Sequence, residues 1–197
     1  MENFWLNPSF DQSSAPYAIV ADRDGTLIEH VDYVSDPSQI RLIVGVKESI
    51  HAILKAGIPF FIFTNQSGVG RGYFSIEEVH ACQTRLFELL EIRTTSIAGW
   101  CIAPEAPETT TGYRKPSARF INEAARHTGQ TTDQFHVIGD TMVDLQTAWN
   151  AGAKAWAVAS GKPELQAAHF NQTILGSYRF KKDFTDCVSE ILELIKF

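Results

Sequence analysis

Short apolar runs that alternate with segments of helical period constrain the fold of this chain most strongly. The clearest run extends from Ile58 to Phe63 and is apolar throughout, so neither of its faces suits contact with solvent. Strands of that kind are typical of parallel sheets covered by helices on each side. Four further runs are candidate strands: Tyr17–Ala21, Ile97–Ile102, Phe135–Ile138 and Lys154–Val158. The pattern predicts an α/β fold with a doubly wound, mostly parallel sheet.

Between these runs, apolar residues recur at the spacing of one helix face. Val46, Ile50 and Ile53 share such a face, and Gly57 follows where the helix is expected to end. A second helix is expected after the capping box that Ser75 forms with Glu78. Three more helices are expected: around Phe120 to Gly129, over Met142 to Ala151, and from Phe184 to Ile195.

Other segments bear on the domain organisation. Residues 1–16 are expected to be an irregular arm, and residues 17–197 a single domain, which suits a chain of 197 residues. Residues 163–180 follow neither period and carry no prediction.

The charge balance excludes some partners. Seventeen basic and 23 acidic residues give a net charge of −6, with no long run of like charge. Broad binding to nucleic acid or to an anionic membrane needs a basic face, so neither is expected. A few well-placed cations could still bind a small phosphorylated substrate. We expect a monomer or a weak oligomer.

Cysteine usage and hydropathy bear on location. Cys82, Cys101 and Cys187 are odd in number and widely spaced, so no disulfide framework is predicted. The chain contains no run of about 18 apolar residues, and its first residues lack the pattern of a signal peptide. The cytoplasm is the expected location.

Polar residues follow the candidate strands, at the point where each strand ends. Asp22 and Asp24 follow the first, Thr64 to Ser67 the second and Asp140 the fourth. Ligands of parallel sheets bind at the carboxyl ends of the strands, so these residues are expected to meet. Asp-x-Asp-Gly could also be an ordinary turn. Two adjacent carboxylates after a buried strand nevertheless repel each other, which favours a cation site.

The other polar segments also have two interpretations. Asp140 and Asp144 open a predicted helix, where aspartate is favoured for capping alone. Together with the first pair they would suit Mg²⁺, which prefers oxygen ligands. The segment from Thr64 to Gly72 could cradle a phosphate or be a flexible loop. Arg114 and Lys115 could be an ordinary solvated pair.

In combination the segments are far more specific. In order and context they resemble the haloacid-dehalogenase (HAD) superfamily of phosphatases and phosphotransferases. More closely, they look like the heptose 1,7-bisphosphate phosphatase group, which is similar to the histidinol-phosphate phosphatases. The resemblance covers about residues 17–163. The matching segments are Asp22–Thr26, Thr64–Gly68, Arg71-Gly72, Arg114–Pro116 and Gly139-Asp140, together with Tyr33-Val34 and Gly161–Pro163.

The resemblance implies roles for the acidic residues. Asp22 would be the nucleophile that forms an aspartyl-phosphate. Asp24 would protonate the leaving alcohol and then activate the attacking water. Mg²⁺ would be held by the Asp22 carboxylate, the Asp24 backbone carbonyl and Asp140, with Asp144 steadying the metal site.

Phosphate and substrate contacts follow in the same way. The resemblance implies that Thr64 and Lys115 bind the transferring phosphoryl oxygens. Arg114 and Arg71 would meet the rest of the substrate. The candidate phosphate cradle adds Asn65, Gln66 and Ser67 to the expected substrate-binding residues.

The chain departs from the heptose group in one loop. That group usually carries a zinc-binding loop before the Arg-Lys-Pro motif. Here Cys101 stands at the first ligand position, but Ala103 replaces the histidine, and Thr111 and Tyr113 replace the last two cysteines. A single thiolate cannot build a tetrahedral site, so no zinc is predicted. Because the loop from Ile102 to Tyr113 borders the substrate entrance in the family, the change bears on specificity.

The leading hypothesis is a magnesium-dependent phosphatase acting on a phosphorylated sugar, with the C7 phosphate of a heptose bisphosphate as first choice. A histidinol-phosphate or other small-metabolite phosphatase is the nearest alternative. A non-catalytic phosphate-binding or receiver-like regulatory module is an alternative of another class. No long insertion separates the motifs, so a HAD-type fold with minimal or no cap domain is expected.

Overall fold

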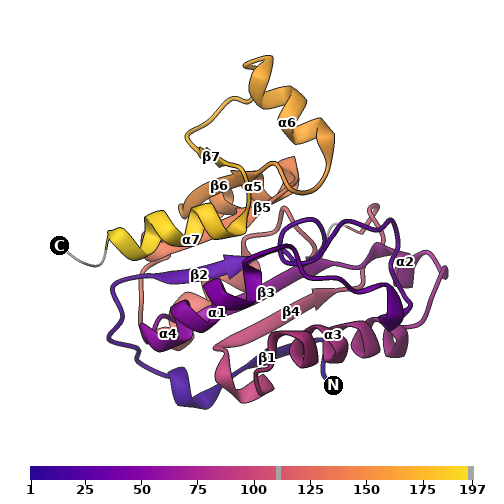
Figure 1. The fold of residues 1–197 in the computed structure, drawn as a ribbon, viewed down its shortest axis with the longest axis horizontal. Coiled ribbons are helices and arrows are strands. Elements are labelled where there is room, and N and C mark those ends of the chain that lie inside the picture. The colour runs from indigo at the N-terminus through magenta and orange to yellow at the C-terminus, as the bar shows by residue number, and fades with distance from the viewer. Residues whose placement is uncertain (110–111, 195–197) are drawn as a thin grey trace.

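Among the residues that the structure describes, seven strands form one central sheet (Figure 1). The computed structural model describes residues 1–109 and 112–194. Across the sheet the strand order is β1-β4-β3-β2-β5-β6-β7. The strands are β1 (Phe4–Leu6), β2 (Ala18–Ala21), β3 (Phe60–Asn65), β4 (Gly99–Ala103), β5 (Phe135–Gly139), β6 (Lys154–Val158) and β7 (Arg179–Lys181). All neighbouring pairs are parallel except β1 with β4, which is antiparallel. The predicted α/β fold is therefore confirmed.

Helices cover both faces of the sheet (Figure 1). One apolar cluster joins the sheet to α1, α3 and α7, and a second joins it to α4 and α5. In chain order the helices are α1 (Val46–Lys55), α2 (Ser67–Gly70), α3 (Ile76–Leu90), α4 (Arg119–Thr128), α5 (Met142–Ala151), α6 (Pro163–Phe170) and α7 (Phe184–Glu193).

Strand β3 illustrates why its sequence is apolar throughout. Side chains of a strand alternate between the two faces of a sheet. Phe60 and Ile62 belong to the cluster under α1, α3 and α7, whereas Phe61 and Phe63 belong to the cluster under α4 and α5. All four side chains are buried. A polar residue at any of these positions would lie in a core.

Capping residues set several helix ends where the sequence predicts them. Ser75 and Glu78 form both hydrogen bonds of the capping box at the start of α3. Gly129 caps the C-terminal end of α4 and Gly152 that of α5, each glycine in the left-handed conformation. The predicted helix after residue 183 is α7, while Ile195 lies outside the described residues.

The N-terminal segment corrects one prediction. Residues 1–16 are not an irregular arm throughout, because Phe4–Leu6 form β1 and pair with the edge of β4. A run of three residues without alternating polarity is too short to identify a strand from sequence. Strand β1 forms because the edge of β4 is available for pairing. The division between an arm and a domain of residues 17–197 stays a prediction.

The segment that carried no prediction also has regular structure. Helix α6 and strand β7 both fall within residues 163–181. Within the parts of the chain that the structure describes, no helix is both long and apolar enough to cross a membrane.

Candidate active site

The central strands bring the predicted site residues together. Asp22 follows β2, Thr64 and Asn65 end β3, and Asp140 follows β5. These three strands are parallel neighbours, so their carboxyl ends meet at one edge of the sheet.

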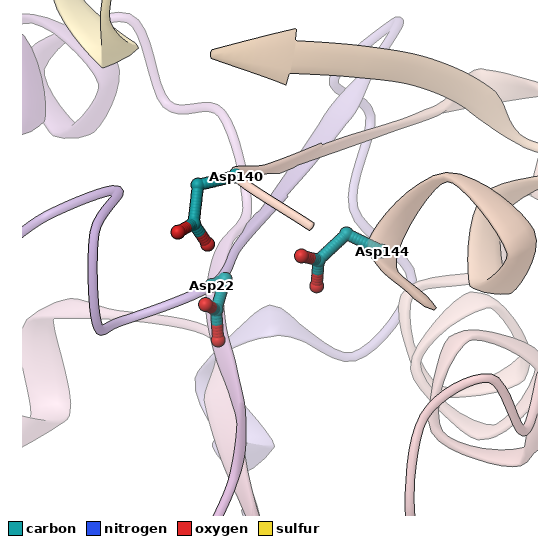
Figure 2. A group of neighbouring side chains, drawn as sticks. All are labelled: Asp22, Asp140 and Asp144. Atoms are coloured by element: carbon teal, nitrogen blue, oxygen red, sulfur yellow. The ribbon is translucent and has the colours of Figure 1, made fainter. Parts of the chain in front are cut away.

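Three buried aspartates form the centre of the site. Asp22, Asp140 and Asp144 each place one carboxylate oxygen within 4.8 Å of the others. Figure 2 shows the carboxylate of Asp144 extending from α5 towards the other two. The Lys115 ammonium lies 2.7 Å from Oδ1 of Asp22 and 2.5 Å from Oδ1 of Asp144. Lys115 therefore balances two of the three carboxylates.

Burial and mutual repulsion disfavour negative charge in this cluster. Burial raises the pKa of Asp22 well above its usual range, with Lys115 opposing and Asp144 and Asp140 adding to the rise. Burial, with repulsion from Asp144, raises the pKa of Asp140 to about 6. Burial opposes charge on Lys115 as well, but Asp144 and Asp22 together raise its pKa. A cation at the cluster would relieve the remaining repulsion.

The donor set fits Mg²⁺. Oδ2 of Asp140 accepts a hydrogen bond from the backbone N–H of Lys162 at 2.8 Å. Oδ1 of Asp140 is buried and has no partner among the described residues, so it is free to bind a cation. Gly25 and Gly161 both pack against this carboxylate, and a side chain at either position would collide with it. Oxygen-only donors of this kind suit a hard cation.

Asp144 links the start of α5 to Lys115. Its Oδ2 accepts hydrogen bonds from the Thr141 backbone N–H and hydroxyl, at 3.1 and 2.5 Å, and its Oδ1 faces Lys115. The capping role that the sequence allowed and the contact with Lys115 are therefore both present.

The Asp24 carboxylate has its own set of partners. Arg23 donates to it from Nε at 3.1 Å and from Nη2 at 3.0 Å. Nε2 of Gln66 donates to Oδ2 at 2.7 Å, and the Thr64 hydroxyl does so at 3.4 Å. Arg23 was not predicted as a site residue, although it lies in the segment Asp22–Thr26 that carried the family resemblance.

Asn65 binds the backbone that carries Lys115. Its Oδ1 accepts from the Lys115 N–H at 2.9 Å, and its Nδ2 donates to the Lys115 carbonyl at 3.2 Å. These two bonds link the end of β3 to the Arg-Lys-Pro segment and help to fix the lysine.

A pocket of about 260 Å³ opens above these groups. Arg71 and Asp144 are not among the residues that line it; Arg71 is exposed and Asp144 is buried below. The other predicted site residues line it: Asp22, Asp24, Thr64, Asn65, Gln66, Ser67, Arg114, Lys115 and Asp140.

The rest of the lining comes from residues that were not predicted as site residues. Tyr33, Val34, Gly68 and Lys162 lie in segments that carried the family resemblance, so that signal could have found them. Others come from the same loop after β2 or from near α2 and α5, without a signal of their own: His30, Val31, Asp32, Phe74, Thr141 and Val143.

The loop that departs from the zinc-binding pattern is held by other contacts. The Tyr113 ring stacks on Phe4 of β1, with 5.0 Å between ring centroids. The Glu105 carboxylate accepts from the Tyr113 backbone N–H at 2.9 Å. Cys101 is buried within β4, and Thr111 lies outside the described residues.

Several known proteins are similar to this chain in sequence or in fold. A HAD-hydrolase-like family model matches residues 112–179. A solved D,D-heptose 1,7-bisphosphate phosphatase from B. bronchiseptica, complexed with magnesium and phosphate, superposes with a TM-score of 0.80. It covers 90% of this chain and 99% of its own, at 23% identity. The chain therefore shares the fold of HAD-type phosphatases.

Proteins with similar sequences identify the family to which the chain belongs. The D-glycero-β-D-manno-heptose-1,7-bisphosphate 7-phosphatase of Mesorhizobium japonicum is 32% identical over 154 residues, which cover 72% of this chain and 69% of the relative. The D-glycero-D-manno-heptose-1,7-bisphosphate 7-phosphatase of Thermosynechococcus vestitus is 31% identical over 157 residues, which cover 73% of this chain and 79% of the relative. The chain belongs to the heptose-1,7-bisphosphate 7-phosphatase family.

Proposed function

We propose that this phosphatase hydrolyses a phosphorylated sugar through an aspartyl-phosphate on Asp22, with the C7 phosphate of a heptose bisphosphate as first choice. The observation that carries the proposal is the buried Asp22 carboxylate, 2.7 Å from Lys115 and next to an oxygen-only cation site. A non-catalytic receiver-like module would also place an aspartate beside a bound cation. Asp24 adds an acid/base at the same pocket, which favours turnover.

In the first step, a carboxylate oxygen of Asp22 attacks phosphorus while the bond from phosphorus to the sugar oxygen breaks. Asp24 gives its proton to that oxygen, and the alcohol leaves. Lys115 has three N–H groups and uses two of them on Asp22 and Asp144. The third can bind a phosphoryl oxygen, and the Thr64 hydroxyl can bind another.

In the second step, the Asp24 carboxylate takes a proton from water as the water oxygen attacks phosphorus. The bond between phosphorus and Asp22 breaks, which releases phosphate and restores both carboxyl groups. We assign Asp22, the Asp24 backbone carbonyl and Asp140 to Mg²⁺, whose charge offsets that of the nucleophile and the phosphate.

The pocket lining is compatible with a small, anionic substrate. Arg114 and Lys162 add positive charge to the lining, and Asn65, Gln66 and Ser67 add polar groups. Heptose bisphosphates are the substrates in the names of the relatives at about 30% identity. Arg71 lies outside the lining, so it is the weakest of the proposed substrate contacts.

The remaining proposals concern zinc, the oligomeric state and the location of the protein. We propose that no zinc is needed, because Ala103 offers no ligand and burial raises the pKa of the Cys101 thiol, which disfavours the thiolate. A monomer or weak oligomer in the cytoplasm stays a prediction.

Release of phosphate from p-nitrophenyl phosphate with Mg²⁺ tests catalysis. We expect turnover by the wild type and loss of at least about a thousandfold in Asp22→Asn, because the amide cannot act as nucleophile. Asp11→Asn, at an exposed site, is the matched control and is expected to keep full activity. Absence of turnover by the wild type from mild acid to mild base would contradict the proposal.

A panel of sugar phosphates and histidinol phosphate then tests the substrate. Preference for heptose 1,7-bisphosphate supports the first choice. Preference for histidinol phosphate would replace it, and slow, equal hydrolysis of every compound would count against a dedicated heptose enzyme.

A further inference from the structure

The Asp24 carboxylate is held by more donors than its neighbour in the motif. Four donor atoms reach it: Nε and Nη2 of Arg23, Nε2 of Gln66 and the Thr64 hydroxyl. Bonds from a guanidinium to a carboxylate are directional as well as strong, because the two planar groups meet at two points. The Asp24 carboxylate therefore has a defined orientation at the pocket wall.

The Arg23 side chain is buried where it can contact Asp24. Its side chain is fully buried directly after β2. Among the described residues, Asp24 is the one carboxylate within salt-bridge distance of its guanidinium, and Nη1 has no partner. A buried charge without a partner is costly, so the pair must form for this residue to be tolerated.

Gln66, between β3 and α2, contacts the same carboxylate. Its Nε2 lies 2.7 Å from Oδ2 of Asp24 and 2.9 Å from Oγ1 of Thr64, and its side chain is almost fully buried. Its backbone N–H donates to the Ala103 carbonyl at 2.7 Å, which fixes the residue against β4. One amide group therefore links the proposed acid/base to the proposed phosphate-binding hydroxyl.

We propose that Arg23 and Gln66 are positioning residues that clamp the Asp24 carboxylate for proton transfer. The inference rests on the proposed function. Lys115 and the cation site at Asp140 would attract a mobile carboxylate, and Arg23 and Gln66 oppose that attraction with three N–H donors. The clamp keeps Asp24 at the wall that it shares with Thr64, facing the pocket.

The proposal predicts a dependence on the leaving group. A poor leaving group needs the proton from Asp24 as the bond to phosphorus breaks, whereas p-nitrophenolate leaves without it. The ratio kcat/KM reports only the steps up to release of the alcohol. We expect Gln66→Met to lower kcat/KM about tenfold with phenyl phosphate and about twofold or less with p-nitrophenyl phosphate, since general acid–base catalysis contributes on the order of 100-fold or more.

Two further variants separate positioning from folding. Arg23→Lys keeps the charge but loses the two-point geometry, so it is expected to show the same selective loss. Arg23→Met could fail to fold, and for that reason Gln66→Met carries the test. Gln83→Met is the control, because Gln83 is fully buried in α3 and its amide has no hydrogen-bond partner among the described residues. It is expected to leave both rates unchanged.

A double variant with Asp24→Asn tests whether Gln66 acts through Asp24. If Gln66 acts through Asp24, adding Gln66→Met to Asp24→Asn causes little further loss with phenyl phosphate. Equal losses with the two substrates, or a full additional loss in the double variant, would overturn the inference. Inactivity of the wild type with both substrates would overturn the proposed function as well, which distinguishes the two failures.

Discussion

Individual carboxylates at this site are placed where charge is unfavourable. Asp140 is buried beside Asp144 and Asp22, and its pKa is raised to about 6 from an ordinary value of 3.8. A raised acid pKa means that the folded protein binds the proton more tightly than the unfolded chain does. The contribution of Asp140 to stability is therefore fully present below about pH 4 and is lost as the pH rises through about 6.

Asp140→Asn is expected to stabilise the metal-free protein at pH 7 by on the order of 1 kcal/mol, because it removes the buried charge. The amide oxygen can still accept from the Lys162 backbone N–H. Melting temperatures of the wild type and the variant in EDTA at pH 7 and pH 4 would measure the stabilisation. The difference in melting temperature is expected to be smaller at pH 4. Phosphatase activity is expected to be lost.

The exposed substitution Asp11→Asn provides the baseline for charge removal and is expected to change the melting temperature little at either pH. A lower melting temperature for Asp140→Asn at pH 7 in EDTA would show that the aspartate charge is favourable without metal. That result would contradict the electrostatic account of the cluster.

At the scale of elements, β1 provides a support that no sequence period indicates. Its Phe4 stacks on Tyr113, and its Trp5 stacks on Trp100 with 4.6 Å between ring centroids. Tyr113 directly precedes Arg114 and Lys115, so β1 is linked through one ring to the segment that carries the proposed phosphate-binding lysine.

Phe4→Ala is therefore expected to lower both stability and activity. Loss of a partly buried phenyl ring costs about 2 kcal/mol, less than for a fully buried one. Urea unfolding would measure the stability, and kcat/KM with p-nitrophenyl phosphate the activity. Val44→Ala is the control, since Val44 is 90% exposed. Unchanged activity in a folded Phe4→Ala protein would mean that the stack does not support Lys115.

For the whole molecule, the sequence predicts the elements that a strong period encodes. Strand β3 is apolar on both faces because both faces are buried, and α5 begins and ends where its capping residues stand. Strands β1 and β7 have three residues each, and their pairing depends on edges supplied by β4 and β6. Such pairing is a property of the assembled sheet, so no local pattern reveals it.

The site divides in the same way. Asp22, Thr64 and Asp140 could be predicted because each follows a recognisable strand. The contact of Gln66 with Asp24, and that of Asn65 with the Lys115 backbone, depend on how segments far apart in the sequence meet in space. The candidate phosphate cradle suggested substrate binding for Asn65, whose amide is bonded to the Lys115 backbone.

The proposed mechanism requires that Asp22 carry the phosphoryl group during turnover. The measurement is rapid quenching of Asp24→Asn with p-nitrophenyl phosphate and Mg²⁺, followed by borohydride reduction and peptide mass spectrometry. Because the good leaving group needs no acid but the second step needs a base, the intermediate is expected to accumulate. We expect conversion of Asp22 to homoserine, in an amount that depends on the substrate. Release of p-nitrophenol with Asp22 unmodified, or with the label on another residue, would contradict it.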